Sequence, residues 1–306
     1  MKRNHSKKLF HLLCLILMLS LVTPTSASAH ESEKIGTVFI HYGKEISKKV
    51  VKVISEKLII AKNTLNIGEY NVVTAEDNDS IHLVVGTSAL ERINNSVLKG
   101  IILTILVDKE TIERAKKINT NNRLYAIYSD PNIYNQISLI QTIMGNDVVI
   151  NIISSDVSCE NFSANTHTTI VTHVVKNSDQ VNRVLKDIEN DEAILFVPDS
   201  TIVNKHSYRN ILLTTYRRGI PTFGYTTRMV KSGALATIYH TLDNYVAEAI
   251  TWIKAVNEGK PSKSTYVETF EIAINQPVAK SFSMDVIGGE PLKEIISRAR
   301  SRNEQD

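Results

Sequence analysis

Short apolar runs alternate with amphipathic stretches along most of the chain. In the first half, five runs have the length and β-branched content of buried strands: residues 36–42, 71–75, 82–86, 101–107 and 124–128. Between them, apolar residues recur at helical spacing in four stretches: residues 45–65, 88–98, 109–118 and 133–144. Strands that alternate with helices predict a parallel sheet covered by helices on both faces.

The second half of the chain repeats this plan. Its predicted strands are residues 148–153, 169–175, 193–197, 222–225 and 235–239, and its predicted helices are residues 178–189, 202–217 and 243–258. In the tail, we expect a strand over residues 266–274 and helices over 276–282 and 291–301. The pattern therefore predicts an α/β protein of two doubly wound parallel-sheet lobes, with an interlobe cleft of the kind that binds small ligands.

This reading divides the chain into four segments. Residues 1–29 form a signal peptide, 30–145 an N-terminal α/β lobe, 146–262 a C-terminal α/β lobe, and 263–306 a return segment with terminal helices. The lobe boundary falls at the polar turn of residues 145–147, and we expect the return segment to cross back over it.

The N-terminus has the pattern of an export signal. Four basic residues and an apolar run over residues 9–22 precede a small-x-small site at Ala27 and Ala29. This predicts an exported, periplasmic protein cleaved after Ala29, because the run is shorter than the ~20 residues of a membrane span; an uncleaved anchor is the alternative. Removing these four from the 35 Lys and Arg leaves 31 against 32 Asp and Glu. The mature chain is then near neutral, so no nucleic-acid partner is expected.

Small, hydroxylic and aromatic residues follow the predicted strands, at the edge where open α/β sheets bind ligands. The candidate ligand-binding residues are Tyr42, Thr87, Ser88, Asp130, Asp199, Ser200, Gly224, Tyr225 and Thr226. Thr87 and Ser88 follow a glycine at a helix start, where N–H groups and hydroxyls can hold a carboxylate or phosphate, or can simply cap the helix. Asp199 can likewise bind a solute or cap the next helix. The tyrosines can stack on a flat solute or pack in the core.

Enzymatic and metal signatures are absent from the sequence. The chain contains no nucleophile elbow, phosphate-binding loop or dinucleotide fingerprint. Cys159 is the single cysteine of the mature chain, and the histidines lack metal-ligand spacing, so we expect no disulfide within the chain, no metal and no cofactor. A secreted α/β enzyme would need His240 or His206 to meet a carboxylate in the cleft.

Several segments together resemble one known family. AIYSDP (126–131) is followed by QISLIQ (136–141), LFVPDSTIVN (195–204), ILLTTYRRGIPTFGYTTRMVKSGALATIYHT (211–241) and IAINQPVAKSF (272–282). In this order and spacing they resemble the ABC transporter substrate-binding protein family whose better-known members bind tryptophan or tyrosine. GTSAL (86–90) extends the resemblance into the first lobe.

This resemblance implies a type I periplasmic-binding-protein fold and a role in capturing a small molecule for an ABC-type import system. The matching ligand positions are Asp199, Ser200, Gly224, Tyr225 and Thr226 in the second lobe, and Thr87 and Ser88 in the first. The expected partners are a small solute, such as an amino acid or an aromatic compound, and a membrane permease. The alternative is an extracytoplasmic accessory protein that signals to a membrane sensor without transport.

Overall fold

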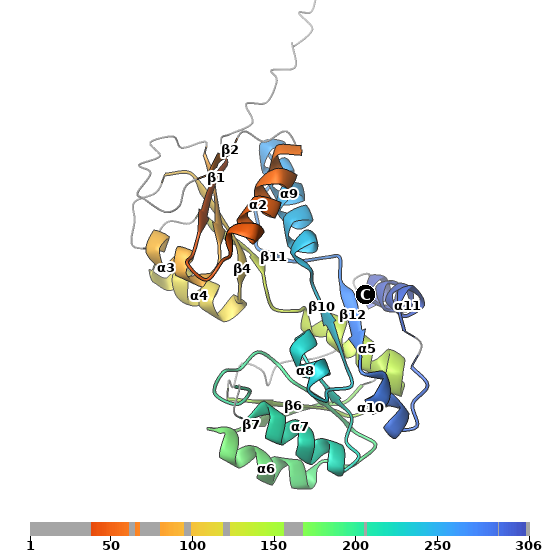
Figure 1. Cartoon of the computed structure of the whole chain (residues 1–306). Coiled ribbons are helices and arrows are strands. Elements are labelled where there is room, and N and C mark those ends of the chain that lie inside the picture. The colour runs from red at the N-terminus through yellow and green to blue at the C-terminus, as the bar shows by residue number, and fades with distance from the viewer. Residues whose placement is uncertain are drawn as a thin grey trace, which may run out of the picture. The chain divides into compact units, whose positions relative to one another are not determined.

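The computed structural model describes residues 38–60, 65–67, 80–94, 99–118, 123–155, 168–204, 207–286 and 288–303. Within these residues the chain forms two six-stranded sheets, each covered by helices (Figure 1). The α/β fold predicted from the alternating pattern is therefore confirmed. The strand predicted at 71–75, Cys159 and His206 lie outside the described residues.

The first sheet is built mainly from the first half of the chain. Its strand order is β11-β5-β4-β3-β1-β2, with all pairs parallel. The strands are β1 (Val38–Tyr42), β2 (Leu65–Ile67), β3 (Ile81–Val85), β4 (Ile101–Val107), β5 (Leu124–Tyr128) and β11 (Thr265–Tyr266). The helices α2 (Lys48–Ile60) and α9 (Leu242–Asn257) pack on one face, and α3 (Thr87–Asn94) and α4 (Lys109–Ile118) on the other.

The second sheet has the same winding order. It runs β12-β10-β9-β8-β6-β7, and all pairs are parallel except β12 with β10. Its strands are β6 (Ile150–Ser154), β7 (Ile170–Val174), β8 (Ala193–Leu195), β9 (Thr222–Phe223), β10 (Ala236–Tyr239) and β12 (Glu271–Ile274). One face carries α6 (Ser178–Asp187), α7 (Tyr208–Arg217) and α8 (Thr227–Lys231). The other carries α5 (Ile133–Met144), α10 (Gln276–Ser281) and α11 (Glu290–Asn303).

The chain passes between the sheets three times. Helix α5, predicted with the first half, packs on the second sheet through Ile137, Leu139 and Ile140. Helix α9, predicted with the second half, packs on the first sheet through Val246 and Trp252, beside α2 (Figure 1). The single strand predicted at 266–274 is in fact two strands, β11 and β12, in different sheets. The domain boundaries stay predictions, but these helices show that sheet membership does not follow chain order.

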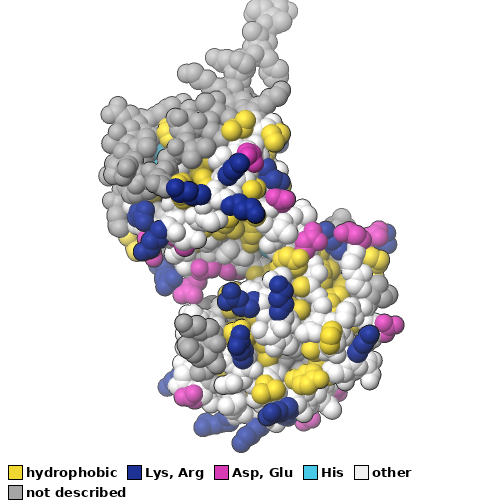
Figure 2. Space-filling model, viewed as in Figure 1, with side chains coloured by type: hydrophobic (Ala, Val, Ile, Leu, Met, Phe, Trp, Pro, Cys, Tyr) yellow, Lys and Arg dark blue, Asp and Glu magenta, His cyan; other side chains and the backbone are white. Residues whose placement is uncertain are grey.

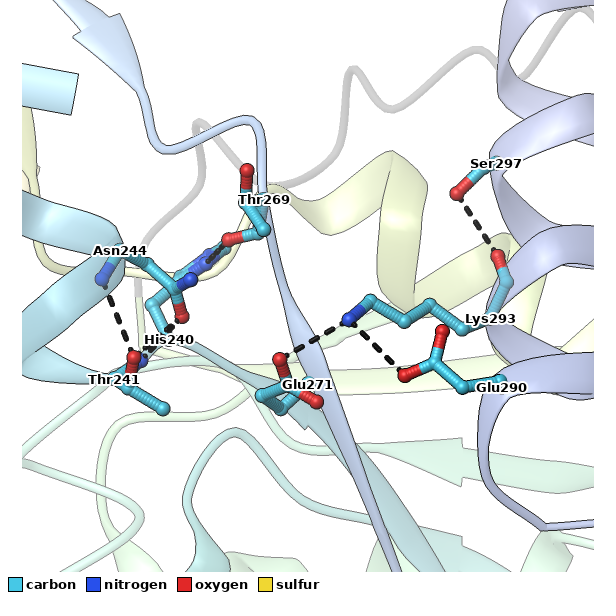
Figure 3. A network of polar contacts seen from close by, with 8 residues as sticks. All are labelled: His240, Thr241, Asn244, Thr269, Glu271, Glu290, Lys293 and Ser297. Atoms are coloured by element: carbon cyan, nitrogen blue, oxygen red, sulfur yellow. Dashed lines mark hydrogen bonds and ion pairs between the residues drawn. The ribbon is translucent and has the colours of Figure 1, made fainter. Parts of the chain in front are cut away.

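Hydrogen bonds tie the crossing segments to each other and to the sheets. Tyr245 on α9 donates its hydroxyl to the Ser129 carbonyl (2.9 Å), in the crossing from β5 to α5. His240, after β10, hydrogen-bonds through Nδ1 to the Thr269 carbonyl (2.9 Å), in the crossing from β11 to β12 (Figure 3). Next to His240, Thr241 caps α9 through a capping box with Asn244, which fixes where the helix begins (Figure 3).

An ion pair and buried apolar side chains hold helix α11 on the second sheet. The Lys293 ammonium lies 3.1 Å from the Glu271 carboxylate on β12 and 3.6 Å from Glu290 (Figure 3). Leu292 and Ile296 of the same helix are buried in the core that contains α5. The terminal helix is therefore part of the second sheet's cover and not a loose tail.

The surface of the described residues carries both signs of charge. Lys, Arg, Asp and Glu side chains are spread over the face shown in Figure 2, among hydrophobic and neutral ones. None of the helices in the described part of the chain is both long enough and apolar enough to cross a membrane.

Candidate functional site

Each sheet has a switch point, where the strand order reverses and the carboxyl ends of two strands part to leave room for a ligand. In the first sheet this lies between β1 and β3. The structure places Glu45 there, in the loop after β1. Its carboxylate accepts hydrogen bonds from the Ser88 backbone N–H (2.9 Å) and the Ser88 hydroxyl. Although partial burial would raise the pKa of the Glu45 carboxyl, these hydrogen bonds hold it below its ordinary value.

Two glycines make room for this carboxylate. A Cβ added to Gly43 would collide with the Ser88 hydroxyl and with the Glu45 carboxylate. A Cβ added to Gly86 would lie 2.6 Å from Glu45 Oε1, and the φ of +87° at Gly86 also favours glycine. The position predicted to hold an anion at Thr87 and Ser88 is therefore filled by an acidic side chain of the same chain.

The switch point of the second sheet is closed in the same way, between β6 and β8. Asp199 Oδ2 accepts hydrogen bonds from the Ser155 backbone N–H (2.5 Å), the Ser155 hydroxyl (2.9 Å) and the Ser154 hydroxyl (3.1 Å). Its other oxygen accepts from the backbone N–H groups of Thr201 (3.0 Å) and Ile202 (3.2 Å). Burial would raise the pKa of the Asp199 carboxyl, but these donors lower it below its ordinary value. Asp199 thus joins two strand ends and caps the following turn.

Asp130 is placed differently. It follows β5, and its Oδ2 accepts one hydrogen bond, from the Lys109 backbone N–H at 2.8 Å. Burial and, to a smaller extent, the charges of Asp108 and Glu110 raise the pKa of the Asp130 carboxyl to about 6, against the lowering effects of the Lys109 hydrogen bond and ammonium charge. No ion pair among the described residues involves Asp130. The charge of the Lys109 ammonium group lowers the pKa of Asp130 without forming an ion pair with it. A half-buried carboxylate with a raised pKa marks a candidate binding site.

Three tyrosines from separate segments lie within range of the charge of this carboxylate. Its negative charge contributes to the raised pKa of Tyr225, Tyr245 and Tyr266, after the larger effect of burial. Asp199 raises the pKa of Tyr225 as well, so Tyr225 lies within the field of both aspartates. Of the residues predicted for the site, Tyr225 is therefore the one on which the charges of both Asp130 and Asp199 act.

An aromatic pair borders Asp130. The rings of Tyr128 on β5 and Tyr266 on β11 have centroids 5.0 Å apart. The Lys109 ammonium lies 5.9 Å from the Tyr128 ring centroid and 6.0 Å from that of Tyr266. A cation over aromatic faces is the geometry of cation–π attraction, so these rings already receive one positive group.

The other predicted site residues have structural partners. Gly224 is buried, and a Cβ there would lie 2.9 Å from the Met229 Cβ. Thr226 caps α8 by accepting from the Met229 N–H (3.3 Å). Ser200 is exposed, with its carbonyl 3.5 Å from the Asn204 amide nitrogen. Tyr42 is half-buried and packs against the core under α2 and α9.

Histidines occupy structural positions in the described part of the chain. His240 binds the Thr269 carbonyl and lies edge-on to the Tyr245 ring, at a centroid distance of 5.8 Å. The buried His41 and His82 on neighbouring strands are joined by a 3.0 Å hydrogen bond, and His82 bonds the Lys99 carbonyl at 2.8 Å. The described residues contain no group of three His, Cys, Asp or Glu side chains that could hold a metal ion.

No family model and no curated protein matches the chain by sequence. Solved structures do match its fold. The ligand-free, open structure of CD0873, a substrate-binding protein with adhesive properties from Clostridium difficile, has a TM-score of 0.60 and 10% identity. The match covers 83% of this chain and 97% of that one. The chain has a substrate-binding-protein fold.

A second structure with this fold is an ABC domain in complex with L-Trp from Streptococcus pneumoniae. It matches with a TM-score of 0.50 and 16% identity, over 82% of this chain and 96% of that one. Both matches span nearly the whole of the known structure, so the substrate-binding fold covers both sheets and not one lobe alone.

The prediction named Asp199 but missed Glu45, and it did not pair Asp199 with Ser155. Glu45 was placed inside a helix expected at 45–65, whereas α2 begins only at Lys48. The sequence signal for Glu45 was its position shortly after a strand, two residues after Gly43. Ser155 was visible as a polar strand end, but its partner Asp199 lies 44 residues away. No local sequence pattern could therefore predict the pairing of Ser155 with Asp199.

Proposed function

We propose that this protein is an exported solute-binding protein that captures a small molecule for a membrane import system. The observation that carries the proposal is Asp130, a half-buried carboxylate after β5 that accepts from the Lys109 N–H and has no ion pair among the described residues, two residues after Tyr128 of the Tyr128–Tyr266 ring pair. On a substrate-binding-protein fold, a polar group at the end of a strand with aromatic neighbours has the composition of a ligand site.

The proposed site comprises Asp130 and Tyr225, with Tyr266 and Tyr128 from the first sheet. In this proposal the carboxylates of Glu45 and Asp199 fill the switch points of the two sheets. The residues that line the approach to the site are Thr87, Ser88, Ser200 and Thr226. Binding would shift an equilibrium between open and closed forms, with the crossing segments as hinges. The mature chain would begin at His30, after an export signal, and would present the closed form to a permease or a membrane sensor.

A thermal-shift screen tests this function. The purified protein is heated with amines, amino acids, sugars, nucleosides and small anions in turn. A compound that binds only the folded state at 100 times its Kd should add about 2.7 kcal/mol to stability. A saturable shift that Asp130→Asn weakens and Asp147→Asn, a change at an exposed turn, leaves intact supports the proposal. A folded protein that responds to no class of compound would contradict it.

A further inference from the structure

Guanidinium and hydroxyl groups meet between α7 and α8, on the cover of the second sheet. Arg209 Nε donates to the Tyr208 hydroxyl (3.4 Å), and the same hydroxyl lies 3.4 Å from the Ser232 hydroxyl. Arg228 lies one helical turn before Ser232, the C-cap of α8, whose N–H donates to the Arg228 carbonyl (3.0 Å). The start of α7 and the end of α8 therefore meet at the Tyr208 hydroxyl.

The Tyr208 hydroxyl has a fixed position. Its side chain is only 8% exposed, because the ring belongs to the buried core under the helices on this face of the sheet. The pKa of this hydroxyl is lowered, first by its hydrogen bonds with Ser232 and Arg209 and then by the charges of Arg209 and Arg228. A buried side chain thus anchors one polar group beside two flexible, positively charged ones.

The positive charge of this region has no acidic counterpart close to it in the sequence. Between Asp199 and Asp243 the chain contains no Asp or Glu, although Lys and Arg recur there, at Lys205, Arg209, Arg217, Arg218, Arg228 and Lys231. Arg209, Arg228 and Lys231 are exposed, and no ion pair between described residues involves them. Figure 2 shows Lys and Arg side chains gathered on the surface where Figure 1 places α8. Such a local excess of positive charge attracts anions.

The kinds of donor at this point match a phosphate group. A guanidinium group carries five N–H donors in a planar fork, and two of them can bind two oxygens of one phosphate. The hydroxyls of Tyr208 and Ser232 can donate to the remaining oxygens. A carboxylate has only two oxygens, so a tetrahedral oxyanion can use more of these donors at once.

We propose that the region between α7 and α8 is a binding site for a phosphate group, formed by Tyr208, Arg209, Arg228 and Ser232. The phosphate can belong to a free solute or to the headgroup of an anionic lipid, since both present the same oxyanion. The site shares no residue with the proposed solute site around Asp130. It therefore stands or falls independently of the solute that the protein captures.

Melting curves in sodium phosphate test the site. The purified protein is compared across a phosphate series with sodium chloride of equal ionic strength, and we expect a saturable rise in Tm with phosphate. The double variant Arg209→Gln/Arg228→Gln should need at least tenfold more phosphate for half of the rise, and Tyr208→Phe at least threefold more. Lys48→Gln/Lys49→Gln, which removes two exposed charges on α2, is the charge-matched control and should behave as the wild type. Phosphate also stabilises folded proteins by exclusion from their surfaces, so an equal rise in all four proteins overturns the site.

Sedimentation with vesicles distinguishes the two sources of the phosphate. The probes are vesicles of equal parts phosphatidylglycerol and phosphatidylcholine, and vesicles of phosphatidylcholine alone. Sedimentation with the anionic vesicles only, lost in the double variant and kept in the control, assigns the site to a lipid headgroup. A saturable phosphate effect without sedimentation assigns it to a free phosphate-bearing solute. A folded protein that responds to neither probe, or a double variant that responds as the wild type does, overturns the proposal.

Discussion

Asp130 is held at a cost to the stability of the free protein. Burial and the nearby charges of Asp108 and Glu110 raise the pKa of its carboxyl to about 6. The folded protein therefore binds more protons at Asp130 than the unfolded chain between pH ~4 and ~6. The stability that this group contributes is present below pH ~4 and is lost as the pH rises through ~6.

Asp130→Asn should therefore stabilise the ligand-free protein. At pH 7.5 we expect the free energy of unfolding to rise by roughly 1–3 kcal/mol, because the amide carries no charge to desolvate and still accepts from the Lys109 N–H. Below pH ~4, where the aspartate is protonated, the two proteins should converge. Urea denaturation at both pH values measures the difference. An equal or lower stability of the variant at pH 7.5 would show that the buried charge of Asp130 does not destabilise the folded protein.

Sequence could place Asp130 and Asp199 at strand ends but could not tell their roles apart. Both follow strands, and both were candidates for ligand contact. What separates them is the set of donors that reach each carboxylate. Asp199 meets Ser154 and Ser155, 45 and 44 residues away, while Asp130 meets a single backbone N–H 21 residues away. Which donors reach each carboxylate depends on the order of the strands in the sheet. No local sequence pattern predicts that order.

At the level of elements, β1 and β3 are joined by a pair of buried histidines. His82 Nε2 faces the Lys99 carbonyl and so must donate, which leaves Nδ1 to accept from His41 Nε2. This arrangement requires the His82 ring to be neutral, because its Nδ1 accepts, and burial disfavours a charge on His41. Burial and the neighbouring His82 lower the pKa of His41 to about 4, and burial lowers the pKa of His82 as well, against its bond to Lys99.

The histidine pair predicts a loss of stability in mild acid. The unfolded chain takes up a proton at His41 near pH 6.5 and the folded protein only near 4, so stability falls as the pH drops through this window. For His41 alone the loss should reach roughly 2–3 kcal/mol. His41→Gln, whose amide can still donate to His82, should lose less stability between pH 7.5 and 4.5 than the wild type does. Asp130 has the opposite pH dependence, but it is common to both proteins and cancels in the comparison. Parallel pH profiles would exclude His41 as the cause.

Most elements could be predicted because the spacing of their apolar residues along the sequence reflects which face of each element is buried. The strand expected at 101–107 and the helices at 109–118 and 133–144 match β4, α4 and α5. The failures occur where pairing is decided at long range. Residues 266–274 contain apolar residues along most of their length, including the buried Val267 and Phe270, yet their two ends pair with different sheets. The helix expected from 202 begins at Tyr208, because Asn204 and Ser207 form a hydrogen-bonded turn before it.

At the scale of the whole molecule, hydrogen bonds and ring contacts link the three crossings to one another, close to Asp130. Asp130 lies in the first crossing, next to Ser129, and Tyr245 of α9 donates to the Ser129 carbonyl. Tyr245 also lies against His240 in the second crossing, and His240 is bonded to Thr269 in the third. Tyr245 is thus placed to link all three crossings.

Removing one hydroxyl should loosen this connection. Tyr245→Phe keeps the ring against His240 but leaves the Ser129 carbonyl without its donor, so we expect a loss of about 1 kcal/mol in the free energy of unfolding. Hydrogen exchange should also quicken at residues 129–132 and 239–241, while amides of β8 and β9 keep their wild-type rates. Tyr216→Phe, the same change on an exposed tyrosine of α7, is the control and should alter neither quantity. Uniformly faster exchange would indicate global destabilisation, and unchanged exchange at the crossings would show that Tyr245 does not hold them together.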